Sequence, residues 1–402
     1  MTDASGGRPL VVLHSTAVWL PRTMPWLHDI VRFLPPHVES HVVAERSVDG
    51  DRFAVERLHL PARAGPVARL RQRLLWRLGR TPATRHVTSV ARRVRPAVVH
   101  SHFGTRAWGD RRAVDASGAR HLVGFYGLDV DQVPRSRPVW VRRYRRLFDD
   151  VDAVLVLGRH MAGRLLERGC PGSKIVVHHV GVDVRAIPYR PRVWNGEPPL
   201  RILMAASFRE KKGIPDGLEV AARLRRRTSV AVTLIGDVTD EPRSRAERDR
   251  IHATISRLGL GDDVRLLGYQ PREAVFAEAR RHDLFLAPSV TAGDGDTEGT
   301  PVTIMEMMAA GIPVASTRHS DIPELVHHGR TGLLAPEHDP EALAATIEEH
   351  LGGLDRWLPM LDAARAHIED AFDALKQGVT LARLYGDVVG GRSPGASPDP
   401  HP

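Results

Sequence analysis

The sequence predicts an α/β protein built from two doubly wound, Rossmann-like sheets. Its 402 residues exceed the roughly 250–300 residues at which a single hydrophobic core stops growing, so at least two domains are expected. Short β-branched runs alternate with helical stretches along both halves, and this alternation is typical of parallel sheets. Four prolines between residues 188 and 199 interrupt every pattern and separate the two halves.

The runs predicted as strands are short and recur along each half. In the first half they are residues 10–13, 42–44, 97–100, 121–125, 154–157 and 175–178. In the second half they are residues 201–205, 230–235, 264–267, 284–287, 313–317 and 332–334. Helical patterns then follow at residues 340–352, 355–370 and 373–389. Each half therefore has enough strands for a sheet of its own.

These patterns predict the domain boundaries. The first domain is expected over residues 1–190, a linker over 191–199 and the second domain over 200–372. A helix over residues 373–390 is expected to pack back on the first domain. Residues 391–402 are rich in Gly, Pro and Ser and are expected to be disordered.

The composition excludes several classes of protein. Hydrophobic residues make up 42% and charged residues 26%, which excludes a wholly disordered or fibrous chain. No run approaches the ~18 apolar residues of a membrane-spanning helix, and the first residues lack the layout of a secretory signal. The one cysteine, Cys170, excludes a disulfide framework and a cysteine-rich metal site. We therefore expect a cytoplasmic protein.

The net charge of +9 is divided unevenly. Residues 1–199 carry 33 Lys and Arg against 17 Asp and Glu, whereas residues 200–402 carry 24 against 31. Two basic segments lie in the first half, at residues 61–80 and at residues 135–146 around Trp140 and Tyr144. Both fit either contact with an anionic membrane surface or helices docked on their own sheet with a charged outer face. A nucleic-acid-binding protein ranks lower, because the sequence has no RNP element, zinc finger or basic zipper.

The most informative stretch is DGDTEGTP, residues 294–301, with VTIMEMMAAG after it. Thr300 is expected to cap a helix that begins at Pro301 and ends at Gly311. The strand at 284–287 leads into this loop, and open α/β sheets bind ligands beyond the carboxyl ends of their strands. The free amides at the helix start suit a phosphate group.

Two carboxylates mark this segment. Glu306 lies among methionines and alanines inside the helix, where a carboxylate needs a partner such as a pair of sugar hydroxyls. Glu298 precedes the helix, with seven residues between the two acids. The alternative is that Glu306 faces solvent and Glu298 is an ordinary loop acid. Asp294 and Asp296 have the spelling of a metal-binding DxD element, but we interpret them as the lead-in to Glu298.

A second candidate site is SFREKKG, residues 207–213, between the strand at 201–205 and a predicted helix near 216–226. Lys211 and Lys212 are two of only four lysines among 57 basic residues. This placement indicates a demand for compact ammonium groups, and together with Arg209 they suit a pyrophosphate. The alternative is a solvated turn.

Taken together, these segments resemble glycosyltransferase family 4. EGTPVTIME resembles the family's E-x7-E element and SFREKKG its phosphate-binding loop, while VVHSHFG, FYGLDV and HSDIPELVHHGRTGLLAPEHDPEALA extend the likeness over most of residues 97–340. The chain looks most like bacterial transferases of exopolysaccharide and colanic-acid type. The resemblance implies the GT-B fold, in which two Rossmann-like domains face each other across a cleft. It also implies that a sugar moves from a nucleotide-diphosphate sugar with retention of anomeric configuration.

The resemblance assigns roles to individual residues. Glu306 would accept hydrogen bonds from the ribose, Glu298 would contact the donor sugar, and Lys212 with Arg209 would hold the diphosphate without a metal ion or other cofactor. The acceptor, a glycan, a lipid-linked molecule or a small molecule, would bind the first domain. The candidate catalytic residues are Glu298, Lys212, Arg209, His102 and Tyr126, and the candidate donor-binding residues are Glu306, Gly299, Thr300, Pro301, Val302, Lys211 and Ser207.

Two departures from the family pattern leave room for a catalytically weakened protein that still binds nucleotide sugar. Tyr126 stands where the family commonly has histidine, and a phenol with a pKa of about 10 cannot act as a base near neutral pH. Ser207 stands where the family has arginine. His102 follows a strand of the first domain, and a structural role is its alternative.

Two further classes of site are ranked lower. The pairs His178-His179 and His327-His328 cannot readily chelate one metal ion, because adjacent side chains of a strand point to opposite faces. No metal site is therefore expected. A dinucleotide-dependent oxidoreductase would also use doubly wound sheets, but no G-x-G-x-x-G follows the first strand.

Overall fold

The computed structural model describes residues 8–20, 24–48, 50, 53–61, 83–239, 241–351 and 354–392. The chain divides into two compact units, which we call the first unit (Met1–His179 with Ala374–Pro402) and the second unit (Val180–Asp373). Residues 180–199 thus belong to the second unit, whereas the sequence predicted a first domain up to residue 190 and then a linker. Backbone pairing explains the difference, because the amides of Arg190 and Arg192 donate to the carbonyls of Ala310 and Gly311, both at 3.0 Å.

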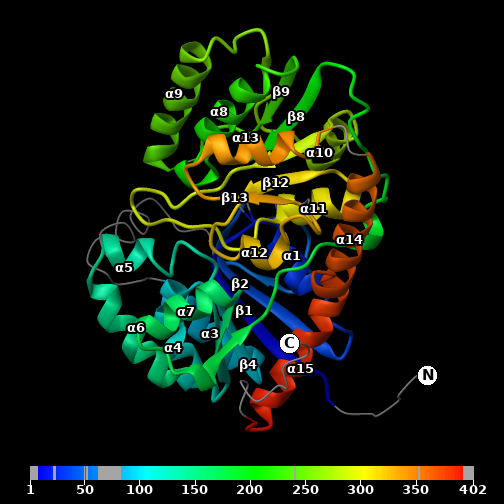
Figure 1. The fold of residues 1–402 in the computed structure, drawn as a ribbon. Coiled ribbons are helices and arrows are strands. Elements are labelled where there is room, and N and C mark those ends of the chain that lie inside the picture. Colours follow the sequence, from blue (N-terminus) through cyan, green and yellow to red (C-terminus); the bar gives the residue numbers. More distant parts are fainter. Residues whose placement is uncertain are drawn as a thin grey trace, which may run out of the picture. The chain divides into compact units, whose positions relative to one another are not determined.

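The first unit contains a seven-stranded sheet in the order β3-β2-β1-β4-β5-β6-β7, with every neighbouring pair parallel (Figure 1). His14 of β1 lies opposite His100 of β4 in the register of the central pair. All the strands expected in the first half are present, and the two-residue β3 adds an edge that the sequence did not indicate. The strands are β1 (Leu10–Trp19), β2 (Val38–Ser47), β3 (Leu58–His59), β4 (Val98–His102), β5 (Arg120–Gly124), β6 (Ala153–Val156) and β7 (Ile175–Val177).

Helices cover both faces of this sheet. Val12 lies in one core cluster with Tyr385 of α15, whereas its neighbour Leu13 packs with Val87 of α3, because successive strand side chains point to opposite faces. The helix expected at 373–390 is α15. Gly378 allows its close approach, since a Cβ there would lie 2.0 Å from the carbonyl oxygen of Phe33. The helices are α1 (Pro25–Arg32), α3 (Ala83–Val94), α4 (Gly104–Ser117), α5 (Gln132–Ser136), α6 (Val139–Asp150), α7 (Arg159–Glu167) and α15 (Ala374–Val389).

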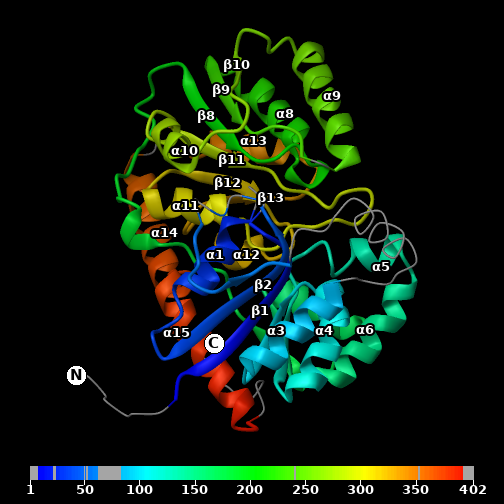
Figure 2. The same ribbon diagram turned by 180° about the vertical axis from the view of Figure 1, so that it is seen from behind.

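The second unit contains a six-stranded parallel sheet in the order β10-β9-β8-β11-β12-β13 (Figure 2). Along the chain this repeats the order of the first sheet, in which the first strand is central and the fourth strand returns to its other side. The strands are β8 (Leu200–Ala205), β9 (Val230–Ile235), β10 (Val264–Leu266), β11 (Leu284–Ala287), β12 (Val314–Thr317) and β13 (Leu333–Ala335).

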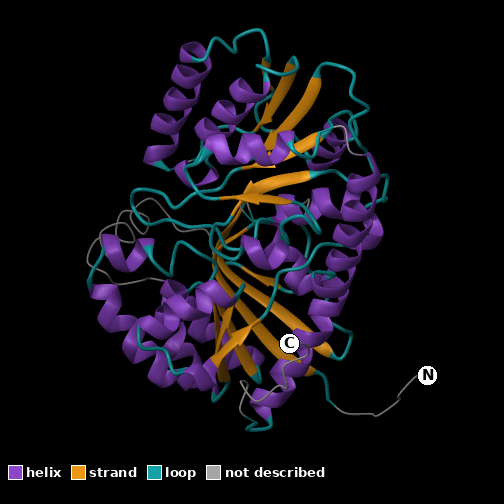
Figure 3. Cartoon of the chain, in the orientation of Figure 1, coloured by secondary structure: helices purple, strands orange, loops and turns teal. Residues whose placement is uncertain are grey.

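Helices also cover both faces of the second sheet, so that both units are doubly wound, as the sequence predicted (Figure 3). Ile202 and Met204 of β8 pack with α8 and α13, whereas Leu203 and Ala205 pack with α11 and the end of α14. The helices of this unit are α8 (Ile214–Leu224), α9 (Pro242–Arg257), α10 (Arg272–Ala279), α11 (Val302–Ala310), α12 (Ile322–Leu325), α13 (Pro340–Glu348) and α14 (Leu354–Ala371).

The basic segment at 135–146 is a docked helix with a charged outer face. On α6, Trp140 and Tyr144 are buried, while Arg142, Arg145 and Arg146 are exposed. The two aromatic rings belong to the core of the first unit and are not available to a partner. Within the described residues, none of the helices combines the length and apolarity needed to cross a bilayer. Residues 62–80 of the other basic segment and residues 393–402 of the predicted tail lie outside the described residues.

Candidate functional site

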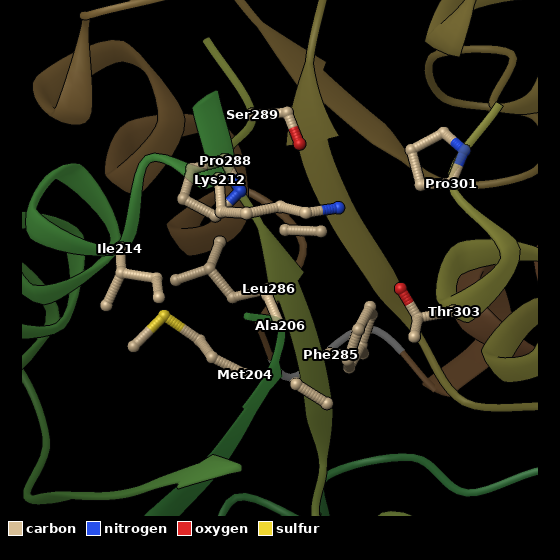
Figure 4. A pocket seen from close by; sticks show the side chains of 12 residues that line it. Met204, Ala206, Lys212, Ile214, Phe285, Leu286, Pro288, Ser289, Pro301 and Thr303 are labelled. Atoms are coloured by element: carbon tan, nitrogen blue, oxygen red, sulfur yellow. The ribbon is translucent and has the colours of Figure 1, made fainter. Parts of the chain in front are cut away.

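A pocket lies within the second unit, beyond the carboxyl ends of β8 and β11. These two strands are neighbours, and the chain proceeds outward from them in opposite directions, through β9 on one side and β12 on the other. Such a switch point is where open α/β sheets bind ligands. The pocket is lined by residues of the two strands, by residues of the loops that follow them and by the start of α11, among them Met204, Lys212, Phe285, Ser289, Pro301 and Thr303 (Figure 4).

The loop that carries Lys212 is held tightly against the end of β11. Gly213 has a positive φ of 59°, and a Cβ there would lie 1.8 Å from the carbonyl oxygen of Pro288. The amide of Val290 also donates to the carbonyl of Lys211 at 2.9 Å. Figure 4 shows the Lys212 side chain extending across the pocket from the side of Pro288 toward that of Pro301. The left-handed conformation of Gly213 therefore allows the close approach that positions Lys212 at the pocket.

Lys212 is ion-paired with Glu298, with 2.8 Å between Nζ and Oε1. Glu298 is buried, and burial by itself would raise the pKa of its carboxyl group. The positive charges of Lys211 and Lys212 outweigh burial and lower that pKa to about 2. Glu298 is therefore ionised at neutral pH although it is shielded from water.

Backbone and side-chain contacts fix Glu298 in place. Its amide donates to Nε2 of His319 at 3.0 Å, and its carbonyl accepts from the hydroxyl of Ser320 at 2.8 Å. Because an amide can only donate, the proton of His319 is on Nδ1, which donates to Glu337 at 2.7 Å. Burial would raise the pKa of Glu337, but the bonds from His319 and from the amide of Thr291 lower it to about 2.

His319 and Glu337 were not among the predicted site residues. Both residues lie in HSDIPELVHHGRTGLLAPEHD, a segment that resembles the family but to which the sequence assigned no role in the site. His319 and Glu337 lie 18 residues apart in sequence, and no local pattern joins them.

The two neighbouring lysines have different positions. Lys211 is buried, and its Nζ donates to Asp296 at 3.2 Å and to the carbonyl of Thr297 at 2.8 Å. Arg209 donates to the same Asp296 at 2.8 Å and pairs with Glu241 at 3.1 Å. Asp296 therefore ties the 207–213 loop to the approach to Glu298. Lys211 holds the loop together and does not line the pocket, whereas Lys212 does.

Helix α11 begins one residue later than predicted. Pro301 occupies the N-cap position, and Thr300 does not cap the helix. The predicted end is confirmed, since Gly311 adopts the left-handed conformation with φ of 81°. The amides of Val302 and Thr303 are in the first turn, where α-helical amides lack an intrahelical partner.

Glu306 is buried on α11 and has a partner from another helix. Nε of Arg272, the first residue of α10, lies 2.5 Å from Oε1 of Glu306. Arg272 is thus the partner that the Glu306 carboxylate needs among the methionines and alanines of α11. Arg272 was not predicted, because one arginine among so many basic residues gives no signal of its own. Glu306 itself does not line the pocket.

The remaining predicted donor-binding residues lie near α11 and after β8. Gly299 and Thr300 are buried in the turn before the helix, Pro301 lines the pocket, and Val302 is half-buried. Ser207 is half-buried in the loop after β8 and does not line the pocket. Ser289 and Thr303 line the pocket but were not predicted.

His102 and Tyr126 lie together in the first unit. Nδ1 of His102 and the hydroxyl of Tyr126 are 2.8 Å apart, and the Tyr126 ring packs against Trp26 with centroids 4.6 Å apart. Burial raises the pKa of Tyr126, so the phenol stays protonated. Asp129 accepts from the amides of Tyr126 and Gly104, and burial raises its pKa to about 6.

The fold and the pocket define the chain as a GT-B protein with a site suited to a phosphorylated ligand. Two solved structures share the fold. HepE of Anabaena in complex with UDP and glucose matches with a TM-score of 0.75 and 16% identity, over 94% of this chain and 100% of that one. Sucrose-phosphate synthase from Thermosynechococcus elongatus matches with a TM-score of 0.76 and 16% identity, over 95% and 99%.

Sequence relatives identify the family. The glycosyl transferase 4-like domain matches residues 9–181, and glycosyl transferases group 1 matches residues 190–353. The amylovoran biosynthesis glycosyltransferase AmsK of Erwinia amylovora is 37% identical over 277 residues, covering 69% of this chain and 66% of that protein. WcaL of Escherichia coli, named for colanic acid biosynthesis, is 35% identical over 301 residues, covering 73% and 71%. The chain therefore belongs to glycosyltransferase family 4, and the resemblance stated from the sequence is confirmed.

Proposed function

We propose that this chain transfers a sugar from a nucleoside diphosphate sugar to a glycan, lipid-linked or small-molecule acceptor during the synthesis of an exopolysaccharide or another cell-surface glycan. The observation that carries this proposal is the pocket at the β8/β11 switch point, where an ammonium group and the start of a helix meet. A diphosphate is the ligand class that matches these groups. The names of AmsK and WcaL supply the biosynthetic setting.

The chemistry required is stabilisation of a leaving group. When the anomeric bond breaks, negative charge develops on the diphosphate and positive charge on the sugar ring. Lys212 and the first amides of α11 are fixed donors for the negative charge. The Lys212 ammonium has three protons, so it can hold a phosphate oxygen while it stays paired with Glu298. We propose that no metal ion is needed at this position.

The two glutamates have separate roles in this proposal. Glu306, oriented by Arg272, accepts hydrogen bonds from the ribose hydroxyls. Glu298, kept ionised by the two lysines, lies next to the positive charge that develops on the sugar ring. Transfer proceeds with retention of anomeric configuration, as the family resemblance implies.

We assign the acceptor to the first unit, near His102 and Tyr126. Tyr126 acts there as a hydrogen-bonding group and not as a base, because burial raises its pKa. The enzyme works on the cytoplasmic side of the membrane, where the exposed arginines of α6 offer positive charge to anionic lipid headgroups.

Incubation of the purified chain with a panel of nucleotide sugars and acceptor glycans tests the proposal. Release of free nucleoside diphosphate is expected with one donor class, and the anomeric configuration of the product, read by NMR, is expected to match that of the donor. Lys212→Met should lower kcat/KM by about 10²–10³-fold. Lys376→Met, at an exposed position on α15, is the matched control and should leave kcat/KM unchanged.

The outcomes separate the proposal from its alternatives. Donor binding without release of nucleoside diphosphate would support the weakened protein in which Tyr126 replaces the family histidine. An unaltered kcat/KM in Lys212→Met would remove the pocket from the mechanism. Salt-dependent binding to an oligonucleotide, with no binding to any nucleotide sugar, would favour the nucleic-acid-binding alternative.

A further inference from the structure

Three buried histidines meet on one face of the first unit's sheet. His100 and His102 are two residues apart on β4, so their side chains point to the same face. His14 on the neighbouring strand β1 lies opposite His100 in the register. All three side chains are nine-tenths or more buried, at 0–2% exposure. Successive side chains of a strand alternate between the two faces of the sheet, so adjacent histidines are separated, whereas these three lie on one face.

Their ring nitrogens are close enough to share one ion. Nδ1 of His14 and Nε2 of His102 are 3.2 Å apart, and one nitrogen from each of the three rings lies within 4.8 Å of the others. With metal–nitrogen bonds of about 2.0–2.1 Å, two nitrogens on a tetrahedral ion are separated by about 3.3 Å. The His14–His102 distance already has this value, and a small movement of His100 would complete the set.

Two tyrosines contact the outer nitrogens of His100 and His102. The hydroxyl of Tyr385 on α15 lies 2.7 Å from Nδ1 of His100, and the hydroxyl of Tyr126 lies 2.8 Å from Nδ1 of His102. Histidines that bind metals are oriented in this way, with the outer nitrogen bonded to a polar group and the inner nitrogen left for the ion. Nε2 of His100 has no hydrogen-bond partner within the described part of the chain. A buried ring nitrogen without a partner is costly, and a metal ion would satisfy it.

We propose that His14, His100 and His102 bind one divalent transition-metal ion of the zinc class. Imidazole nitrogens without a carboxylate or thiolate suit Zn²⁺ or its neighbours and not Mg²⁺ or Ca²⁺, which prefer oxygen ligands. Three protein ligands leave the fourth position for water or a bound hydroxyl group.

All three histidines belong to the first unit, whereas the pocket that carries Lys212 lies within the second unit. The proposed metal site departs from the expectation of no metal site, which among the histidines considered only the adjacent pairs His178-His179 and His327-His328. A bound ion would link β1, β4 and α15 through His14, His100 and the Tyr385 contact. It would therefore stabilise the fold of the first unit, and the proposal does not depend on the identity of the donor.

The test uses the full chain prepared without a polyhistidine tag and stripped of metal by a chelator. Titration with Zn²⁺ in a calorimeter should show one ion bound per chain, with a rise in Tm at saturating zinc. His100→Gln should abolish this binding. His41→Gln is the matched control, because His41 and His59 form a second histidine pair, 2.9 Å apart, in the same unit, and it should bind zinc as the unaltered chain does.

A milder variant keeps the test decisive if His100→Gln does not fold. Tyr385→Phe retains the ring on α15 and removes only the hydroxyl beside His100, and it should weaken zinc binding by about 10–100-fold. The proposal is overturned if the unaltered chain binds no stoichiometric zinc, or if Tyr385→Phe binds it with unchanged affinity. Zinc binding that survives in a folded His100→Gln would also overturn it. In those cases the three histidines form a hydrogen-bonded cluster only.

Discussion

The two units share a strand order, but one buried cluster of ionisable groups in the first unit and one in the second differ in charge. In the first unit, burial lowers the pKa values of His14, His100 and His102 and raises that of Tyr126, so this cluster is uncharged. In the second unit, Glu298 is also buried, yet its pKa falls to about 2. The same sheet topology therefore supports a neutral cluster in one unit and a fully charged one in the other.

The difference lies in what stands within reach of each buried group. Burial disfavours the charged form, and an opposite charge nearby or hydrogen bonds to the charged form can reverse its effect. The 207–213 loop supplies Lys211 and Lys212 to the carboxylates of the 294–298 loop. Among the described residues, the side chains that bond to His14, His100 and His102 are imidazoles and phenols. A site with charges already in place suits an anionic donor, since no reorganisation is needed when the donor binds.

The strongest test of this comparison removes Lys211. Because Lys211 pairs with Asp296 and also lowers the pKa of Glu298, Lys211→Met should reduce the free energy of unfolding by about 3–5 kcal/mol, measured by urea titration. Lys174→Met in the first unit is the control, since Lys174 donates to two backbone carbonyls, and its loss should cost about 1 kcal/mol. A loss below about 1 kcal/mol for Lys211→Met would show that the remaining cations suffice.

Acid should destabilise the second unit by protonating Glu298. Its pKa of about 2 lies below the ordinary value of 4.5, so the unfolded chain takes up the proton first as the pH falls. The stabilisation, roughly 3 kcal/mol, is fully present above about pH 5 and is lost progressively toward pH 2. Urea unfolding of the unaltered chain and of Glu298→Gln should therefore differ at pH 7 and converge toward pH 2. A difference that stays constant with pH would contradict this account.

Glu306→Gln should change donor affinity more than stability. The proposed hydrogen bonds from ribose to a carboxylate are worth about 1.5–3 kcal/mol, so the Kd for the donor should rise about 10–100-fold. Stability should change by less than about 1 kcal/mol, because the Arg272 side chain is 40% exposed and can be hydrated. Calorimetric titration with the donor identified in the panel measures the Kd. Glu341→Gln, at an exposed position of α13, is the control, and equal affinities in the two variants would separate Glu306 from the donor.

The smallest effect on stability is expected in the uncharged cluster formed by Tyr126 and the three histidines of the first unit. Tyr126→Phe removes a hydroxyl that lies 2.8 Å from His102 and should cost about 1 kcal/mol in the metal-free protein. Tyr144→Phe is the matched control, because the buried Tyr144 hydroxyl has no hydrogen-bond partner among the described residues, and its removal should be neutral or stabilising. Urea unfolding of the two variants measures the difference. Equal free energies of unfolding would show that the Tyr126 hydroxyl contributes nothing to the cluster.

Local patterns predicted most of the fold. Every expected strand is present, because buried parallel strands are runs of β-branched and other apolar residues, and Gly311 ends α11 as its sequence position indicated. The two-residue β3 is too short to show a period. The start of α11 differs by one residue, since Pro301 takes the cap position that the sequence suggested for Thr300. The boundary at Val180 depends on contacts far along the chain, such as the hydrogen bond from the amide of Val182 to the carbonyl of Phe372 at 2.9 Å.

For the site, too, local sequence patterns predicted some features and contacts between distant residues decided the others. Sequence alone determined the two-sheet architecture, the family, and the two loops that carry Lys212 and Glu298, because residue type and spacing are local properties of the chain. Only the tertiary structure decided which charges meet. It paired Arg272 with Glu306 across 34 residues, buried Lys211 against Asp296 and placed three histidines on one sheet face. These contacts join residues distant in sequence, and their energies depend on distance and burial, which exist only after the chain has folded.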